Sequence, residues 1–69
     1  MAYEPWQQRV FEERNELLER TKKLLVFTSA DACLDLRVDQ LNLLRGQLHL
    51  MVQLLHVLND RIAAFDGEA

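Results

Sequence analysis

The sequence contains few of the residues that stabilise small domains through covalent or metal links. Among its 69 residues there is one cysteine, Cys33, and there are two histidines, His49 and His56. A single cysteine cannot form a disulfide within the chain, and zinc or iron sites need several Cys or His ligands at close spacing. His49 and His56 lie seven residues apart, without a third ligand at helical spacing. We therefore expect no disulfide, no metal site and no cofactor, with both histidines on a solvated or interface side of a helix.

Long apolar runs and a secretion signal are also missing. The first ten residues, MAYEPWQQRV, do not form a positively charged stretch followed by an apolar one. Polar residues such as Arg45, Gln47 and His49 interrupt the most apolar segment, so it has no apolar window of about 18 residues. The formal net charge is −3, whereas nonspecific nucleic-acid binding needs many Lys and Arg contacts to phosphates. These absences predict a soluble cytoplasmic protein that binds neither a membrane nor DNA or RNA.

Glycine and proline are scarce as well, with two glycines and one proline. Leucine, glutamate, arginine and glutamine dominate instead, and this composition of good helix formers predicts an all-α fold. Pro5 is typical of the first turn of a helix, and SADACLD at 29–35 is the only plausible break, with Cys33 as a small apolar residue in the corner. We predict one helical domain: a helix at about 5–28, a linker at about 29–35 and a longer helix at about 36–65.

The predicted first helix has one apolar side of ordinary width. On a helix of about 3.6 residues per turn, this side is formed by Trp6, Val10, Leu17, Thr21, Leu24 and Thr28. The polar side carries the i,i+4 pairs Glu16–Arg20 and Glu19–Lys23, each expected to contribute about 0.2–0.5 kcal/mol. A single apolar side predicts packing against the second helix in an antiparallel hairpin.

The predicted second helix is apolar on two sides. One stripe has the 3-4 spacing of a helical-bundle seam and consists of Leu41, Leu44, Leu48, Met51, Leu55, Leu58, Ile62 and Phe65. A second set, Leu43, Leu50, Leu54 and Val57, lies roughly opposite. One partner helix covers only one stripe, and an exposed line of aliphatic side chains is rare in monomers. Because each fully buried Leu or Val contributes about 1.5–3 kcal/mol, the second set predicts assembly into a homo-oligomeric helical bundle.

Gly46 stands inside this second helix, where glycine is unfavourable. It costs about 1 kcal/mol relative to alanine in a helix interior. The plain explanation is that another helix passes close to Gly46, which again points to assembly.

No enzyme motif is present: the chain has no nucleophile elbow, P-loop, HExxH sequence or dinucleotide fingerprint. We therefore expect a protein that is not an enzyme. Trp6 is either a cap over the apolar end of the hairpin or an aromatic platform at a helix N-terminus suited to phosphate, and Tyr3 just before it is a further candidate. Arg20, Lys22 and Lys23 form the only basic run. Such runs are mostly solvated, although cations gathered around a symmetry axis can hold an anion.

The order of residues along both predicted helices resembles a family of small phage proteins. In PWQQRVFEERNELLERTKKLLVF, at 5–27, an aromatic residue is followed by QQRV, charged steps, an E-L pair and a basic residue before the last turn. In QLNLLRGQLHLMVQLLHVLNDRIAAF, at 40–65, LL, QL, a methionine, a VL pair and RI precede a final phenylalanine. The family includes the anti-CBASS sponges, which are hexameric proteins that sequester the cyclic di- and trinucleotide messengers of bacterial CBASS immunity.

The resemblance implies stoichiometric capture of a cyclic di- or trinucleotide in the host bacterial cytoplasm, by a homo-oligomer that is a hexamer in the family. It implies that Trp6 stacks a base, that Arg20 with Lys22 or Lys23 holds phosphate, and that Arg61 serves a second site for a larger ring. Tryptophan stands here where tyrosine is common in the family, which leaves the choice of ligand open.

A different interpretation of the same residues involves no nucleotide. The second apolar stripe is also typical of a structural or protein-interaction module, whose exposed side receives an amphipathic helix from another protein. The oligomeric state in solution distinguishes the two interpretations, because in a homo-oligomer other copies of the same chain would already cover that stripe.

Overall fold

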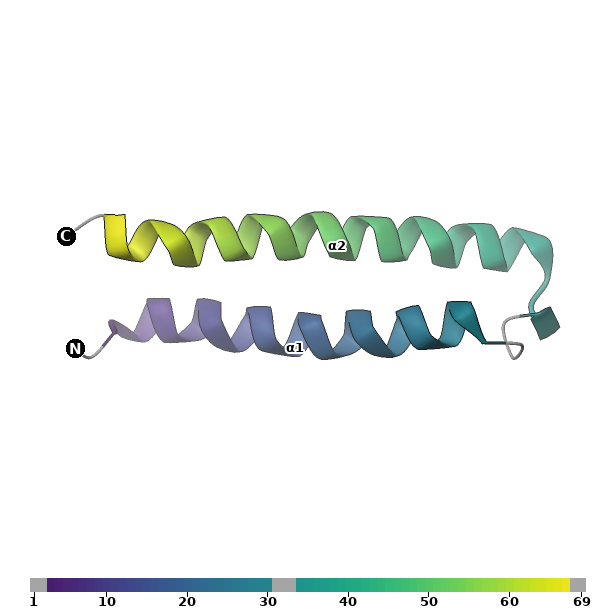
Figure 1. The fold of residues 1–69 in the computed structure, drawn as a ribbon, viewed down its shortest axis with the longest axis horizontal. Helices are drawn as coiled ribbons and strands as arrows, with labels where there is room; N and C mark the ends of the chain where they lie inside the picture. Colours follow the sequence, from purple (N-terminus) through teal and green to yellow (C-terminus); the bar gives the residue numbers. More distant parts are fainter. Residues whose placement is uncertain (1–2, 31–33, 68–69) are drawn as a thin grey trace.

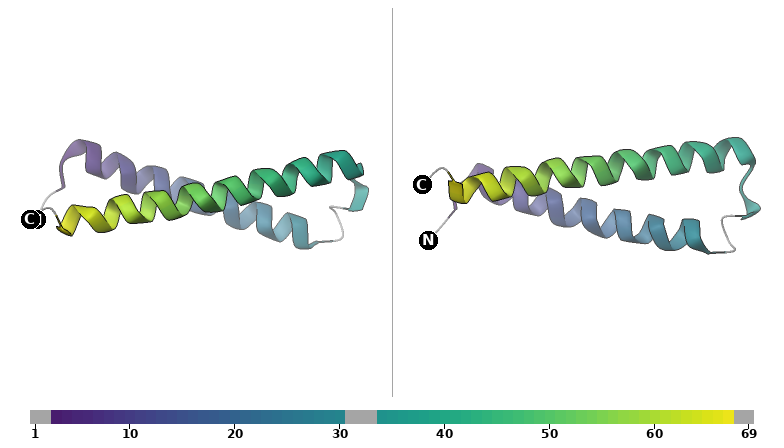
Figure 2. Two further views of the ribbon diagram at one scale, coloured as in Figure 1. Left: turned by 90° about the horizontal axis from the view of Figure 1, so that it is seen from above. Right: turned by 45° about the horizontal axis from the view of Figure 1, so that its top comes forward.

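Two long antiparallel helices make up the structure (Figure 1). The structure is a computed structural model that describes residues 3–30 and 34–67. The first helix, α1, comprises Pro5–Ser29, and the second, α2, comprises Val38–Gly67. The start of α1 and the end of α2 lie at one end of a rod that measures 49 × 15 × 15 Å, and Figure 2 shows the helices crossing along their length. The expected all-α hairpin with a longer second helix is confirmed, and the described residues contain no strand.

The start of α1 is fixed by a short hydrogen-bond pattern around Glu4. The side-chain oxygen of Gln7 accepts a bond of 2.7 Å from the backbone N–H of Glu4. The backbone N–H groups of Gln7 and Gln8 donate to the carbonyl of Glu4 at 2.9 and 3.0 Å. Pro5, which has no N–H to satisfy, occupies the first helical position. The first turn is therefore well formed, and it carries the carboxylate of Glu4 at its start.

The helix ends differ by one or two residues from those expected at about 28, 36 and 65. α1 continues to Ser29, and Leu34 and Asp35 form a single 3₁₀ turn before α2 begins at Val38. The N–H of Leu41 bonds to the carbonyl of Arg37 at 2.9 Å, which closes the first turn of α2. At the other end α2 runs through Gly67, because one glycine lowers helix stability without forbidding helical dihedrals. Cys33, expected in the corner, lies outside the described residues.

The core lies between the helices and is small. Its buried apolar side chains are Val10, Leu55, Leu58 and Phe65. Thr21 is also buried, with 3% of its surface exposed, and its hydroxyl donates to the carbonyl of Leu17 at 2.7 Å. That bond satisfies the hydroxyl of Thr21, the buried polar residue among the described residues, so burying it carries little penalty.

α2 has the two apolar stripes expected from the sequence. Every residue of the 3-4 seam from Leu41 to Phe65 is buried or half-buried against α1. The second set, Leu43, Leu50, Leu54 and Val57, is exposed, and Leu43 and Leu50 keep 67% and 68% of their surface open. One hairpin therefore covers one stripe of α2 and leaves the other uncovered.

Candidate functional site

The two aromatic candidates belong to a cluster at the end of the hairpin where α1 starts and α2 ends. Tyr3 packs edge-on against Phe11, with ring centroids 4.9 Å apart. Trp6 packs edge-on against Phe65 at 5.3 Å, and Phe11 contacts Phe65 at 5.7 Å. Trp6 thus caps the apolar end of the core, one of its two expected roles. It still has 47% of its surface exposed, so part of the indole remains open to a ligand.

Phosphate binding at the start of α1 is disfavoured by Glu4. The carboxylate of Glu4 stands at the N-cap, where the positive end of the helix dipole already has a negative neighbour. A phosphate placed there would meet a like charge. An anion-binding site is therefore expected elsewhere along the hairpin.

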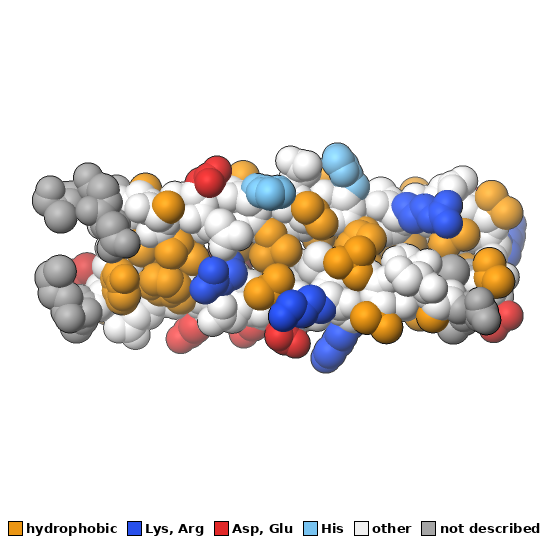
Figure 3. Space-filling view, viewed as in Figure 1, with side chains coloured by type: hydrophobic (Ala, Val, Ile, Leu, Met, Phe, Trp, Pro, Cys, Tyr) orange, Lys and Arg blue, Asp and Glu red, His pale blue; other side chains and the backbone are white. Residues whose placement is uncertain are grey.

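Cations meet an apolar surface in a groove between the second half of α1 and the first half of α2. The groove has a volume of about 390 Å³, and its lining consists of Arg20, Lys23, Leu24 and Phe27 from α1 with Gln47 and Met51 from α2. The amide of Gln47 donates a long bond of 3.9 Å to the sulfur of Met51. In the space-filling view, Lys and Arg side chains gather over the middle of α1, next to hydrophobic side chains along the boundary between the helices (Figure 3). We call this the cationic groove.

The three cations of the basic run do not all reach the cationic groove. Arg20 and Lys23 line it, whereas Lys22 is not among the described lining residues. The ammonium of Lys22 instead lies 4.0 Å from a carboxylate oxygen of Glu19, so the partner of Glu19 is Lys22 rather than the expected Lys23. This pair is exposed and contributes little to stability. It makes Lys22 the member of the run least suited to hold a ligand.

The residues expected to bind ligands do not come together within a single chain. Trp6 and Arg20 are fourteen residues apart on the same helix, which is about 21 Å at 1.5 Å per residue. Arg61 is exposed on α2 and does not line the cationic groove. Whether these side chains meet across a chain–chain interface stays a prediction.

Sequence reasoning missed most of the cationic groove. Leu24 and Met51 were assigned to the core, and Phe27 and Gln47 were given no role, although all four line it. A usable signal was present in α1, because Lys23, Leu24 and Phe27 follow Arg20 by three, four and seven residues, and so share one side of a helix.

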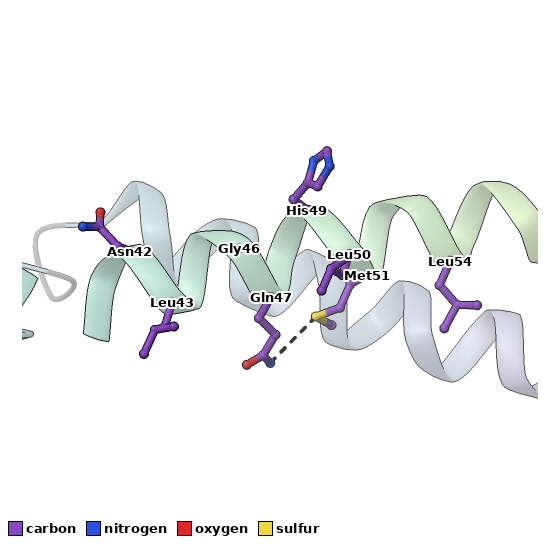
Figure 4. Close-up of a pocket in the computed structure, with 8 residues that line it drawn as sticks. All are labelled: Asn42, Leu43, Gly46, Gln47, His49, Leu50, Met51 and Leu54. Atoms are coloured by element: carbon purple, nitrogen blue, oxygen red, sulfur yellow. Dashed lines mark hydrogen bonds between the residues drawn. The ribbon is translucent and has the colours of Figure 1, made fainter. Parts of the chain in front are cut away.

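A second, more apolar surface lies on the outer side of α2. Its lining consists of Asn42, Leu43, Gly46, Gln47, His49, Leu50, Met51 and Leu54, around a shallow space of about 690 Å³. In Figure 4 the side chains of Leu43, Gln47, Leu50 and Leu54 extend to the same side of α2, while His49 extends to the other. A methyl group at Gly46 would meet nothing within 4 Å in the described chain, so the expected close approach at Gly46 is not made by α1.

Two of the expected absences concern a membrane-spanning helix and a metal site. Neither helix of the described chain is long and apolar enough to cross a membrane. Among the described residues, no group of three or more His, Cys, Asp or Glu side chains is placed to hold a metal ion.

An antiparallel hairpin with a cationic groove beside an uncovered apolar helix face defines a small all-α protein whose surface is suited to binding and assembly. The chain belongs to the Sequestin family, whose model matches residues 4–64. No curated protein and no solved structure matches the chain. The match covers both helices nearly completely, and the family name, Sequestin, indicates sequestration of a ligand. At this coarse level it agrees with the sponge expected from the resemblance.

Proposed function

We propose that this protein is a stoichiometric sponge that captures cyclic di- or trinucleotide messengers of CBASS-type defence in the bacterial cytoplasm, without chemical turnover. The observation that carries the proposal is the cationic groove, where Arg20 and Lys23 line one surface together with the apolar side chains of Leu24, Phe27 and Met51. Membership of a family named for sequestration supports the same general role.

The chemistry of the cationic groove matches the two parts of a nucleotide. A guanidinium such as that of Arg20 can bind two phosphate oxygens at once, and an ammonium such as that of Lys23 adds a mobile point charge. The apolar surface beside them can receive a base, with Phe27 as an aromatic neighbour. Because phosphate and base are recognised by different side chains a few residues apart, the groove favours a nucleotide over a simple anion.

The open form of the groove indicates that one chain supplies only part of the site. Both cations are exposed in the single hairpin, and interactions between exposed charges are weakened by water and salt. Enclosure by a second chain in the proposed homo-oligomer, a hexamer by the resemblance, would lower the local dielectric and strengthen each contact. The same assembly is needed to bring Trp6 to a base, since it lies far from Arg20 within one chain.

The test is calorimetry with a nucleotide panel and three matched variants. The panel contains cyclic dinucleotides, cyclic trinucleotides, linear dinucleotides and nucleotides that carry one base and a diphosphate. We expect at least one cyclic member to bind at micromolar Kd or tighter, which is about −8 kcal/mol. Arg20→Ala and Lys23→Ala should each weaken binding about tenfold or more. Lys22→Ala removes the same kind of charge outside the groove and should leave Kd within about twofold.

Two results would overturn the proposal. Failure of every cyclic nucleotide to bind at 10 μM or tighter (about −7 kcal/mol) would exclude the sponge function. Equal losses of affinity in Lys22→Ala and Lys23→Ala would exclude the cationic groove as the binding site. Ligand released by denaturing the complex should also return chemically unchanged on chromatography, because capture without turnover consumes nothing. Cleaved ligand would mean an enzyme.

Trp6 is tested separately, because it also supports the fold. Trp6→Ala removes an aromatic pair with Phe65, which costs about 0.5–1.5 kcal/mol of stability in comparable pairs. If the exposed face of the Trp6 indole also stacks a base, Trp6→Ala should in addition bind the nucleotide about fivefold or more weakly. Its helical content and assembly should stay unchanged. Trp6→Phe keeps an apolar ring at the same position and should retain most of the stability and most of the affinity for the nucleotide. Unchanged affinity in assembled Trp6→Ala would leave Trp6 as a cap alone.

The protein-interaction alternative draws on the uncovered stripe of α2. It predicts a monomer in solution that binds no member of the nucleotide panel. A homo-oligomer that binds one of them would exclude it.

A further inference from the structure

The uncovered side of α2 has a pattern that reads the same in both directions along the chain. It runs through Asp39, Leu43, Gly46, Leu50, Leu54, Val57 and Arg61, at successive spacings of 4, 3, 4, 4, 3 and 4 residues. All seven residues are exposed, and the spacings are those of a helix–helix seam. We call this the outer seam. Its centre is Leu50, and its two ends carry opposite charges.

We propose that the outer seam pairs antiparallel with the outer seam of a second copy of this chain, about a two-fold axis at Leu50. In this register Leu50 meets Leu50 of the second copy, and Leu43 meets Val57 of the second copy. Leu54 of the second copy then lies over Gly46, where no atom of the described chain, apart from the neighbouring residues and backbone of α2 itself, comes within 4 Å of an added methyl group. The position that lacks a side chain thus receives one from the other helix.

Charge selects this pairing over its alternatives. The antiparallel register places Asp39 against Arg61 of the second copy at both ends, and the contact that Asp39 makes to Arg37 at 3.5 Å is exposed. A parallel pair would set like charges against each other at both ends, which is destabilising. An antiparallel shift of seven residues toward the C-terminus would bury Arg61 against Gly46 with no carboxylate opposite, at the cost of an unpaired buried charge.

The outer seam is long enough for a helix–helix contact. From Asp39 to Arg61 it spans 22 residue steps, or about 33 Å at 1.5 Å per residue, which is about six turns of α2. The centre of the contact would be aliphatic and its ends charged, as in specific protein interfaces.

The pairing also changes the ligand site, and this consequence rests on the proposed function. Gln47 and Met51 line both the cationic groove and the outer apolar surface, and they flank Leu50 at the axis. A two-fold axis perpendicular to α2 at Leu50 therefore places the cationic grooves of two chains next to each other on the same side of the α2 pair. Arg20 and Lys23 of both chains would then surround one trough. Two equivalent pairs of cations suit a ligand with two phosphates related by symmetry, so one ligand per two chains is expected.

Single cysteines test the register without any ligand. In a Cys33→Ser background, Leu50→Cys places one thiol opposite its own copy, within disulfide distance. Mild oxidation should link this variant into dimers at least tenfold faster than Val57→Cys, whose thiol faces Leu43 of the second copy. A mixture of Leu43→Cys and Val57→Cys should yield mixed dimers. Self-linking of Val57→Cys as fast as Leu50→Cys, or no linking in any variant, would overturn the pairing.

Charge reversal provides a second, independent measurement. Asp39→Arg and Arg61→Asp should each weaken self-association about tenfold by analytical ultracentrifugation, since each change places like charges together at two symmetric positions. The double variant restores opposite charges and should recover most of the loss. Arg45→Glu on the polar side of α2 is the control and should leave association unchanged. A double variant that associates no better than either single one would overturn the register, whether or not nucleotides bind.

Discussion

The inner and outer sides of α2 carry the same kind of residue in opposite surroundings. Leu58, on the inner side, keeps 2% of its surface exposed, whereas Leu50, on the outer side, keeps 68%. Both are leucines in the interior of one helix, so local helix propensity does not distinguish them. The difference arises because α1 has one apolar side and can cover only one side of α2. Hydrophobic spacing thus identifies the side chains that pack against another helix, but it does not show whether that helix belongs to the same chain or to another one.

The largest expected effect comes from truncating the inner side. Leu58→Ala removes the most buried side chain of a small core and should lower the free energy of unfolding by about 2–5 kcal/mol. The same substitution at Leu50 removes an exposed side chain and should change monomer stability by no more than about 0.5 kcal/mol. Urea denaturation at the lowest usable protein concentration measures both. If Leu58→Ala does not fold, its circular dichroism should lose the helical signal, whereas Leu50→Ala should keep it. This difference makes the same comparison. Equal losses in the two variants would contradict the assignment of inner and outer sides.

A charge on the outer side should act on association instead of folding. Leu50→Glu places two carboxylates opposite each other at the proposed two-fold axis, where they would be desolvated and repel. Self-association should weaken at least a hundredfold, while the helical circular dichroism of the chain at low concentration stays near that of the parent. The thermal midpoint, which rises with protein concentration in an associating chain, should become independent of it. A matched substitution on the polar side, His56→Glu, should keep the concentration dependence. An unchanged mass for Leu50→Glu would show that the outer side is not the interface.

The hairpin was predictable because each step depends on local periodicity. The 3-4 spacing from Leu41 to Phe65 identified the inner side of α2 residue by residue, and every one of those positions is buried or half-buried. The helix ends were less predictable, since the 3₁₀ geometry at Leu34 and Asp35 has no strong sequence signal. Even so, the differences amount to one or two residues and leave the architecture unchanged.

The cationic groove was not predictable in the same way. Its lining depends on how α1 and α2 are rotated against each other, which brings Arg20 and Phe27 beside Gln47 and Met51. Sequence spacing fixes which residues share a side of one helix but not which residues of another helix face them. Arg20 and Lys23 were found through the basic run, whereas the apolar part of the groove needed the packed hairpin.

The smallest expected effect comes from Gly46→Ala, which should change the stability of the hairpin and its self-association in opposite directions. Gly46→Ala should stabilise the isolated hairpin by up to about 1 kcal/mol, because alanine is the better helix former and nothing in the described chain lies within 4 Å of the added methyl group. The same methyl group would occupy the space proposed for Leu54 of a second copy, so self-association should weaken severalfold. Dilute urea denaturation measures the first effect, and ultracentrifugation the second. Ala63→Gly, at an exposed position of α2 outside the outer seam, is the matched control, and it should lower helix stability without a specific effect on association. If Gly46→Ala stabilised the chain and left association unchanged, Gly46 would be an ordinary exposed glycine and the register centred on Leu50 would lose the contact that explains it.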